Sequence, residues 1–421
     1  MKAGKKRRQK VNYEQLVVDT VAPYSREKLH VFLNFPDVAV TDQSHWAVLL
    51  IADAIMDTHM MEMFDRCGIV KGKVLGFQWK LISRQIGHCS CFRTAGLAAK
   101  RCISHQKAST DSATGSEADF CGDHLLLITV FGATGQQGGP VARALLSSGF
   151  AVRAVTRNPD SEKSLSLKQA GAELVKGDLE DRSTIDEAVK GAYGVFLVTD
   201  YFGILHRLGD DNRAEAEEIA QGKAVVDASA RAGVKHVVYS GLPGAKDVIG
   251  HRVPHLDGKA VVEKYLGEAG VPYTSVHYPA YYDNFGSYFK AQPQPDGTYA
   301  ITLPMNGPMY TIAVDDGGPV VASVFSNPGE FLGKKIGIAG DRKTVDEYAA
   351  IISKVTGKTV KYNQVPVEVF ASFPFPGADD LAYMFEFFAS GNHNQDQTLT
   401  KRLNPNVLSF EEWAGRNKDK F

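Results

Sequence analysis

A glycine-rich segment at residues 131–139 has the residue types and the spacing of a phosphate-binding loop. Its glycines stand at positions 132, 135 and 138, directly after an apolar run and directly before a helical pattern. Glycine permits a tight turn and a close backbone approach, and the free N–H groups at a helix N-terminus attract an anion. A purely structural turn is the alternative, but the context favours a pyrophosphate site. The expected contacts are Gly132, Ala133, Thr134, Gly135, Gln136, Gln137 and Gly138.

The residues after the second expected strand indicate which dinucleotide this loop holds. An NAD enzyme usually has a carboxylate there, which binds both ribose hydroxyls and would repel a 2′-phosphate. This chain has Thr156-Arg157-Asn158 instead. The planar guanidinium of Arg157 suits a phosphate, so we predict a preference for NADP(H), with Arg157 and Asn158 at the cofactor. A solvated arginine at a strand end is the alternative.

Polar residues also follow the third and fourth expected strands. Asp178 and Leu179 come after the third strand, where the Asp178 side chain can reach the adenine amine. Thr199, Asp200 and Tyr201 end the fourth strand, near the middle of the cofactor. Ligands of doubly wound sheets bind outside the carboxyl ends of the strands, which favours both placements. Turn chemistry explains either segment equally well.

The groups expected to perform hydride chemistry are incomplete. Short-chain dehydrogenases pair a serine after the fifth strand with a tyrosine four residues before a lysine, and the tyrosine delivers the proton. Here Ser240 supplies the serine, but His255 stands four residues before Lys259. Lys259 can still bind the ribose hydroxyls, whereas His255 differs from tyrosine in shape and reach. We therefore expect loss of reductase activity, with Ser240 and His255 as vestigial candidates.

A tyrosine-rich segment follows the sixth expected strand. Tyr281, Tyr282, Asp283 and Asn284 are expected over the nicotinamide half of the crevice. The aromatic rings could shield the nicotinamide, and Asn284 could hydrogen-bond the carboxamide or a neighbouring residue. Core packing accounts for the tyrosines nearly as well.

Alternating apolar runs and helical patterns from residue 125 onward are typical of β-α-β units on a parallel sheet. We expect a Rossmann-type doubly wound α/β sheet with six strands, at residues 125–131, 151–156, 173–176, 194–199, 236–240 and 273–276. The expected helices between them are at residues 137–148, 161–170, 183–190, 214–232 and 257–268. Two further helical patterns, at 344–356 and 378–389, indicate a smaller C-terminal α+β cap.

Three regions follow from these patterns: an N-terminal extension (1–123), an NADP-binding Rossmann domain (124–284) and a cap (285–421). All five cysteines lie in the extension, and that fits a reducing compartment. The pair Cys89 and Cys91, near His88, Cys102 and His105, matches no common zinc pattern, so we expect no metal.

The overall charge gives no reason to expect a nucleic acid or a membrane as a partner. The chain has 47 basic and 48 acidic residues, for a formal net charge of -1. Its longest apolar stretch, at residues 46–56, is too short to span a bilayer. We expect an intracellular protein in the cytoplasm. The basic run Lys5-Lys6-Arg7-Arg8 leaves nuclear import open, although a solvated chain end is the more ordinary interpretation.

With these residues in hand, the chain after residue 125 resembles the NmrA-like family, and most closely its vertebrate members. Besides the glycine-rich segment, six segments carry the resemblance: Val155-Thr156-Arg157-Asn158-Pro159, Gly171-Ala172-Glu173, Val237-Val238-Tyr239-Ser240-Gly241-Leu242, Asp257-Gly258-Lys259, Gly270-Val271-Pro272 and Pro376-Gly377-Ala378. The resemblance implies an atypical short-chain dehydrogenase fold without the catalytic tyrosine. It also implies a redox sensor that binds NADP(H) and regulates partner proteins, argininosuccinate synthase among them, through a homodimer controlled by NADPH. An NADPH-dependent reductase of a small carbonyl or quinone substrate is the alternative.

The chain departs from the family pattern in three places. Residues 202–217 form a longer segment than expected. Ala220 replaces a lysine that the family places against the cofactor, and His277 stands where an arginine is expected. None of these departures affects the phosphate-binding loop.

Overall fold

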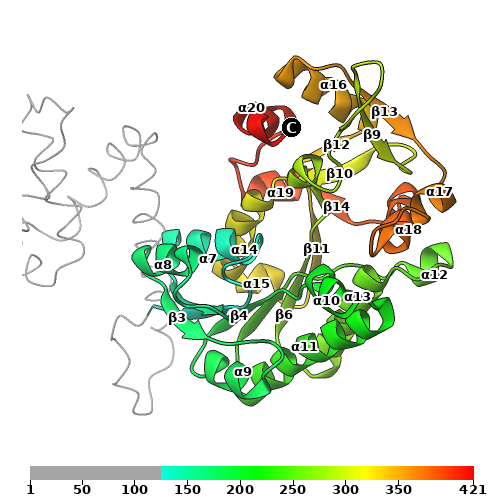
Figure 1. Ribbon diagram of the computed structural model, residues 1–421. Helices are drawn as coiled ribbons and strands as arrows, with labels where there is room; N and C mark the ends of the chain where they lie inside the picture. The colour runs from blue at the N-terminus through cyan, green and yellow to red at the C-terminus, as the bar shows by residue number, and fades with distance from the viewer. Residues whose placement is uncertain (1–124) are drawn as a thin grey trace, which may run out of the picture. The chain divides into compact units, whose positions relative to one another are not determined.

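The computed structural model describes residues 125–421, and the predictions for residues 1–123, including the cysteines and the basic run, lie outside this part of the chain. Eight parallel strands form its central sheet (Figure 1). Six of them are β1 (Leu127–Val130), β2 (Ala151–Thr156), β3 (Glu173–Lys176), β4 (Gly194–Leu197), β5 (His236–Tyr239) and β6 (Tyr273–His277). Their spatial order is β6-β5-β4-β1-β2-β3, which confirms the predicted doubly wound sheet. β4 and β5 are buried along their whole length, which explains their continuous apolar sequence.

Two short strands that the sequence analysis did not predict extend the sheet beyond β6. They are β11 (Lys335–Ile338) and β14 (Gln395–Asp396), and both run parallel to their neighbours. The chain leaves the central sheet after β6, which ends at His277, and returns to it twice. The last third of the chain therefore contributes both to the cap and to the central sheet.

Helices cover both faces of the sheet (Figure 1). One face carries α7 (Gly138–Ser147), α8 (Glu162–Gln169), α14 (Gly317–Ser326), α15 (Pro328–Phe331) and α19 (Gln397–Leu403). The other carries α9 (Arg182–Val189), α11 (Asp211–Arg231) and α13 (Pro254–Glu268). α10 (Tyr201–Leu208), which follows the carboxyl end of β4, and α12 (Lys246–Ile249) complete this part of the fold. All five helices expected between the first six strands are present as α7, α8, α9, α11 and α13, with ends shifted by a few residues.

α7 and α14 pack with their backbones in direct contact. Both helices begin with the sequence Gly-Gly-Pro-Val. A Cβ atom on Gly318 would lie 2.5 Å from the carbonyl oxygen of Pro140, so only glycine fits at this crossing. This contact ties the start of α7, and with it the glycine-rich loop, to the C-terminal part of the chain.

The cap contains two small sheets and four helices, as the predicted α+β cap requires. β7 (Ala280–Tyr281), β10 (Met309–Ile312) and β12 (Asp341–Lys343) form one sheet, and β8 (Gln292–Pro293), β9 (Tyr299–Leu303) and β13 (Val360–Gln364) form the other. The helices are α16 (Val345–Thr356), α17 (Val367–Ala371), α18 (Ala378–Ala389) and α20 (Phe410–Arg416), with 3-10 turns η1 (Tyr282–Gly286), η2 (Val314–Asp316) and η3 (Lys418–Lys420). α16 and α18 confirm the two helical patterns, and a capping box between Thr344 and Glu347 begins α16.

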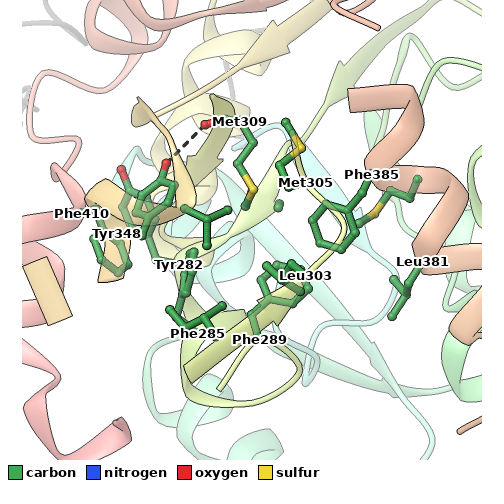
Figure 2. Close-up of a cluster of buried hydrophobic side chains, with 14 of the residues drawn as sticks. Tyr282, Phe285, Phe289, Leu303, Met305, Met309, Tyr348, Leu381, Phe385 and Phe410 are labelled. Carbon is green, nitrogen blue, oxygen red and sulfur yellow. Dashed lines mark hydrogen bonds between the residues drawn. The ribbon is translucent and has the colours of Figure 1, made fainter. Parts of the chain in front are cut away.

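The cap has its own aromatic core (Figure 2). The ring of Tyr348 packs against Phe285 and Phe410, with ring centroids 4.9 and 4.8 Å apart. The Tyr348 hydroxyl donates a hydrogen bond to the carbonyl oxygen of Met309 at 3.3 Å. Within residues 125–421, no helix has both the length and the apolar character needed to cross a membrane.

Candidate functional site

The glycine-rich loop connects β1 to α7 in a conformation that requires glycine. Gly132 has φ of +63°, a region that side chains disfavour. A Cβ atom on Gly138 would lie 2.1 Å from the carbonyl oxygen of Gly132, so the helix begins as close to the turn as a backbone can come. The N–H of Gly135 donates to that same oxygen at 2.8 Å.

The loop leaves backbone donors available for an anion. Within the described residues, no protein acceptor receives the N–H of Thr134, Gln136 or Gln137, and no side chain caps the N-terminus of α7. Ala133, between the glycines, is fully buried and donates its own N–H to Val155. Free N–H groups at a helix N-terminus bind phosphate, so the loop fits the pyrophosphate of a dinucleotide.

A second polar feature joins the loop to the segment after β6. The side-chain nitrogen of Gln137 donates to the hydroxyl of Tyr281 at 2.5 Å. The side-chain oxygen of Gln137 and the hydroxyl of Tyr278 are both buried without a hydrogen-bond partner in the described structure. Buried polar atoms are nearly always satisfied, so these two atoms mark places where a bound polar group fits.

Arg157, at the end of β2, is exposed, and within residues 125–421 it forms no ion pair or hydrogen bond. Its guanidinium is therefore available for a phosphate. The side-chain oxygen of Asn158 accepts the N–H of Asp160 at 3.1 Å, so this residue shapes the turn behind Arg157.

Asp178 and Leu179 have local structural roles. A side-chain oxygen of Asp178 accepts the N–H of Glu180 at 3.1 Å, and its own N–H donates to the hydroxyl of Thr184 at 3.0 Å. The side chain of Leu179 packs against the core beneath α9 and α11. The turn interpretation therefore accounts for both residues, and it leaves one carboxylate oxygen of Asp178 for a ligand.

Thr199, Asp200 and Tyr201 lie at the carboxyl end of β4, as expected, but each side chain already has a partner. The Asp200 side chain caps α10 by accepting the N–H of Gly203 at 3.1 Å. Tyr201 is buried and donates to Asp211 at 2.7 Å. Burial, with this hydrogen bond, raises the pKa of Tyr201 well above its ordinary value, so this tyrosine stays protonated.

Lys259 lies in a buried network with Thr199 and Glu218. Its Nζ atom donates to the carbonyl oxygen of Thr199 at 3.1 Å, to the Thr199 hydroxyl at 2.8 Å and to Glu218 Oε1 at 2.6 Å. The Thr199 hydroxyl in turn donates to the same Glu218 oxygen at 2.7 Å. The other oxygen of Glu218 is buried without a partner. The lysine is therefore at the predicted place, held by a carboxylate that the sequence analysis missed.

Ser240 and His255 differ in how they are held. Ser240 is buried directly after β5, and within residues 125–421 its hydroxyl has no protein partner. His255 lies in the first turn of α13, where its Nδ1 hydrogen-bonds Asp380 of α18. Asp380 also accepts the backbone N–H of His255 at 3.1 Å.

The segment after β6 divides between crevice and cap. Tyr281 contacts Gln137 of the loop, whereas the ring of Tyr282 packs in the cap core and its hydroxyl donates to Leu408 at 3.1 Å. Asp283 pairs with Lys420 at 3.0 Å and accepts the N–H of Val314 at 3.3 Å. The carbonyl oxygen of Asn284 accepts the N–H groups of Ser287 and Phe289. Core packing thus accounts for the side chain of Tyr282, which the sequence analysis had expected over the nicotinamide.

The three departures from the family pattern also have structural counterparts. Ala220 lies exposed on α11 and offers no side-chain donor. His277 Nε2 lies 2.6 Å from Glu263, which also pairs with Lys335 at 2.5 Å. Burial raises the pKa of Glu263, but the contacts with His277 and Lys335 outweigh it and hold the pKa below its ordinary value. The longer segment forms α10 and the start of α11.

Two carboxylates of this site, Glu218 and Asp380, were not among the sequence candidates. Glu218 lies on the buried face of α11, where most of the other residues are small or apolar, and an acid on that face was the available signal. Asp380 is 125 residues from His255, and no local pattern connects the two. Within residues 125–421, no group of three or more histidine, cysteine or acidic side chains could hold a metal ion.

A doubly wound sheet with a glycine loop and free N–H groups at its first helix defines the fold class of dinucleotide-binding proteins. The NmrA-like family model matches residues 126–414, and the chain belongs to this family. An NmrA-like family domain-containing protein of Dictyostelium discoideum is 30% identical over 300 residues, which cover 68% of this chain and 96% of that protein. The NmrA-like family domain-containing oxidoreductase FrzB of Cladobotryum sp is 33% identical over 283 residues, 62% of this chain and 83% of that protein.

Among solved structures, the negative transcriptional regulator NmrA in complex with NADP is similar in fold. Its TM-score is 0.59 at 23% identity, over 70% of this chain and 96% of that chain. At this identity the likeness shows the fold alone, so the cofactor of the present chain has to be argued from its own residues.

Proposed function

We propose that the chain binds NADP(H), with the pyrophosphate against the free N–H groups of the glycine loop and the 2′-phosphate against Arg157. The unpaired guanidinium of Arg157 and the absence of a carboxylate at the end of β2 support NADP(H) over NAD(H). The structure of NmrA with NADP, a protein of the same fold, adds support.

Titration calorimetry with NADPH and NADH tests this proposal. We expect tighter binding of NADPH by the full chain, and we expect Arg157→Ala to weaken NADPH binding only. Lys163→Ala, which removes an exposed cation on the neighbouring helix α8, is the matched control. Equal dissociation constants for the two cofactors would contradict the role of Arg157.

We further propose that the protein works as a redox sensor, in which NADP(H) occupancy changes its assembly or its affinity for partner proteins. The observation that carries this proposal is the network around Lys259. All three N–H groups of its Nζ atom are engaged by Thr199 and by Glu218 of α11. A ribose hydroxyl that takes one of these N–H groups must displace Thr199 or Glu218, so binding is linked to the packing of α11 against α13. Under this proposal the protein binds NADPH and responds to its concentration, but it does not oxidise NADPH.

The readouts that follow from the family resemblance are a change between monomer and dimer and regulated binding to argininosuccinate synthase. Sedimentation velocity of the full chain, with and without NADPH, measures the first, and partner binding at both cofactor states measures the second. Arg157→Ala is the control, because the same change should then require a higher NADPH concentration. A ligand shifts an equilibrium only by its differential affinity for the two states. Unchanged sedimentation together with unchanged partner binding would rule out the sensor.

One observation favours a second function, an NADPH-dependent reductase of a small carbonyl or quinone substrate. His255 stands at the position of the missing tyrosine and is held in place by a buried carboxylate. The relative FrzB is named an oxidoreductase, which also supports this candidate. Loss of NADPH absorbance in the presence of carbonyl and quinone acceptors tests it, and a wild-type rate equal to the rate without protein would contradict it.

A further inference from the structure

His255 lies in the first turn of α13, four residues before Lys259 and on the same face of the helix. Residues four apart on a helix share a face, and Lys259 reaches the carboxyl end of β4 through Thr199. The imidazole of His255 lies against the first residues of α10, with ring centroids 6.2 Å from Tyr201 and 5.2 Å from Phe202. The side chain is 8% exposed.

Asp380 decides how this imidazole can react. It is 1% exposed and comes from the cap helix α18, so the cap supplies it to the crevice. One of its oxygens accepts the backbone N–H of His255 and the other is bonded to Nδ1. A carboxylate at Nδ1 keeps a proton on that nitrogen and fixes the orientation of the ring, so that Nε2 is the nitrogen left to face a ligand. Within residues 125–421, Nε2 of His255 has no protein partner.

We infer that His255, oriented by Asp380, donates a proton through Nε2 to the oxygen of a planar conjugated carbonyl compound. This inference rests on the second proposed function, the reductase. NADPH, when bound, would supply the hydride that reduces the substrate and would itself be oxidised to NADP⁺. The Nε2–H bond of the protonated histidine breaks and an O–H bond forms on the substrate, so that C=O gains one hydride and one proton. The neutral imidazole then recovers a proton from water, and Asp380 acts as a positioning residue throughout.

The aromatic side chains next to His255 indicate the class of substrate. Phe202 is half-buried, and its ring centroid lies 6.3 Å from that of Tyr288, which is 68% exposed. Together with His255 these rings form a cluster of flat side chains at the start of α10. Planar conjugated molecules stack on such rings, whereas small aliphatic carbonyls gain little from them.

Three single substitutions of the full chain test the inference. His255→Asn keeps a side-chain donor at the position of Nδ1, and can therefore still bond Asp380, but it carries no transferable proton. Asp380→Asn removes the carboxylate that fixes the tautomer. His251→Asn is the matched control, because His251 is exposed and also contacts α18, through a ring stacked on Tyr383 with centroids 4.3 Å apart.

The measurements are NADPH affinity without any acceptor, NADPH oxidation with phenanthrenequinone as the acceptor, and the tautomer of His255 by nitrogen NMR. We expect all variants to bind NADPH with wild-type affinity and the wild type to show the Nδ1–H tautomer. His255→Asn should lower kcat by about 10²–10⁴-fold with little change in KM for the quinone, as loss of a proton donor does. Asp380→Asn should lower kcat and abolish the single tautomer, and His251→Asn should change neither.

The outcomes separate this inference from the cofactor proposal. Normal NADPH binding without turnover in the wild type overturns the reductase function and this inference with it, whereas a His255→Asn variant with the wild-type kcat overturns the inference alone. A wild-type tautomer with the proton on Nε2 and not on Nδ1 also overturns it, independently of any variant. No NADPH binding by the wild type overturns the cofactor proposal and this inference together.

Discussion

Replacing Lys259 by methionine is expected to destabilise the protein, because the buried carboxylate of Glu218 then has no ion-pair partner. The side chain of Glu218 is 0% exposed, and Lys259 is its ion-pair partner, with Nζ at 2.6 Å. Removal of one partner of a buried ion pair costs about 3–5 kcal/mol, because the remaining charge is uncompensated. At roughly 2–4 °C per kcal/mol for a domain of this size, the melting temperature should fall by on the order of 10 °C.

The double variant Lys259→Met/Glu218→Leu distinguishes this cause from a simple loss of packing. It removes both charges and keeps similar side-chain volumes, and such replacements are often neutral or stabilising. Most of the lost stability should therefore return in the double variant. Lys264→Met, on the same helix, is the control, because Lys264 is 79% exposed and its pair with Glu268 at 3.7 Å is worth less than about 1 kcal/mol.

Unfolding in urea, followed by circular dichroism, measures the free energy of unfolding of each variant, and calorimetry measures NADPH affinity on the same samples. Affinity should fall equally in the single and double variants, since both lack the lysine that is predicted to bind the ribose hydroxyls. A Lys259→Met variant as stable as Lys264→Met would refute the reasoning, and so would a double variant no more stable than the single one.

Four further predictions follow from the described residues. Arg157→Ala should cost on the order of 2 kcal/mol, or roughly thirtyfold, in NADPH affinity by calorimetry, with no change for NADH. Gly138→Ala should abolish binding of both cofactors in the same assay, because the added Cβ would lie 2.1 Å from a backbone oxygen of the loop. Burial lowers the pKa of His236 from 6.5 to about 4, so its contribution to stability is complete above pH 6.5 and is lost as the pH falls toward 4. The free energy of unfolding, measured in urea, should therefore fall less between neutral and acidic pH in His236→Gln than in the wild type. The two decreases should differ by up to about 3 kcal/mol. Deletion of residues 1–119 should leave a folded protein that binds NADPH, and an insoluble product would show that the boundary is wrong.

The local parts of the site could be predicted from the sequence. The glycine loop depends on residues within a few positions of one another, and the strand before it and the helix after it have strong apolar periodicity. Arg157 follows β2 directly, so its place at the strand end was fixed as soon as that strand was recognised. The alternation of strands and helices predicted a doubly wound sheet, because right-handed crossovers leave few other topologies.

Tertiary structure alone decided the remainder, because the remaining contacts join residues far apart in the chain. Glu218 meets Lys259 across 41 residues and Asp380 meets His255 across 125, and no local pattern encodes either pair. β14 is only two residues long and β11 lies in the part of the chain that was assigned to the cap, and pairing with β6 and with each other makes them strands of the central sheet. Tyr281 and Tyr282 are adjacent in a single tyrosine-rich motif, yet one contacts the loop and the other the cap core, since successive residues of an extended segment point to opposite sides. The sequence by itself therefore determined where a dinucleotide phosphate can bind, and the packing of the cap against the sheet determined which side chains are held at the other end of the crevice.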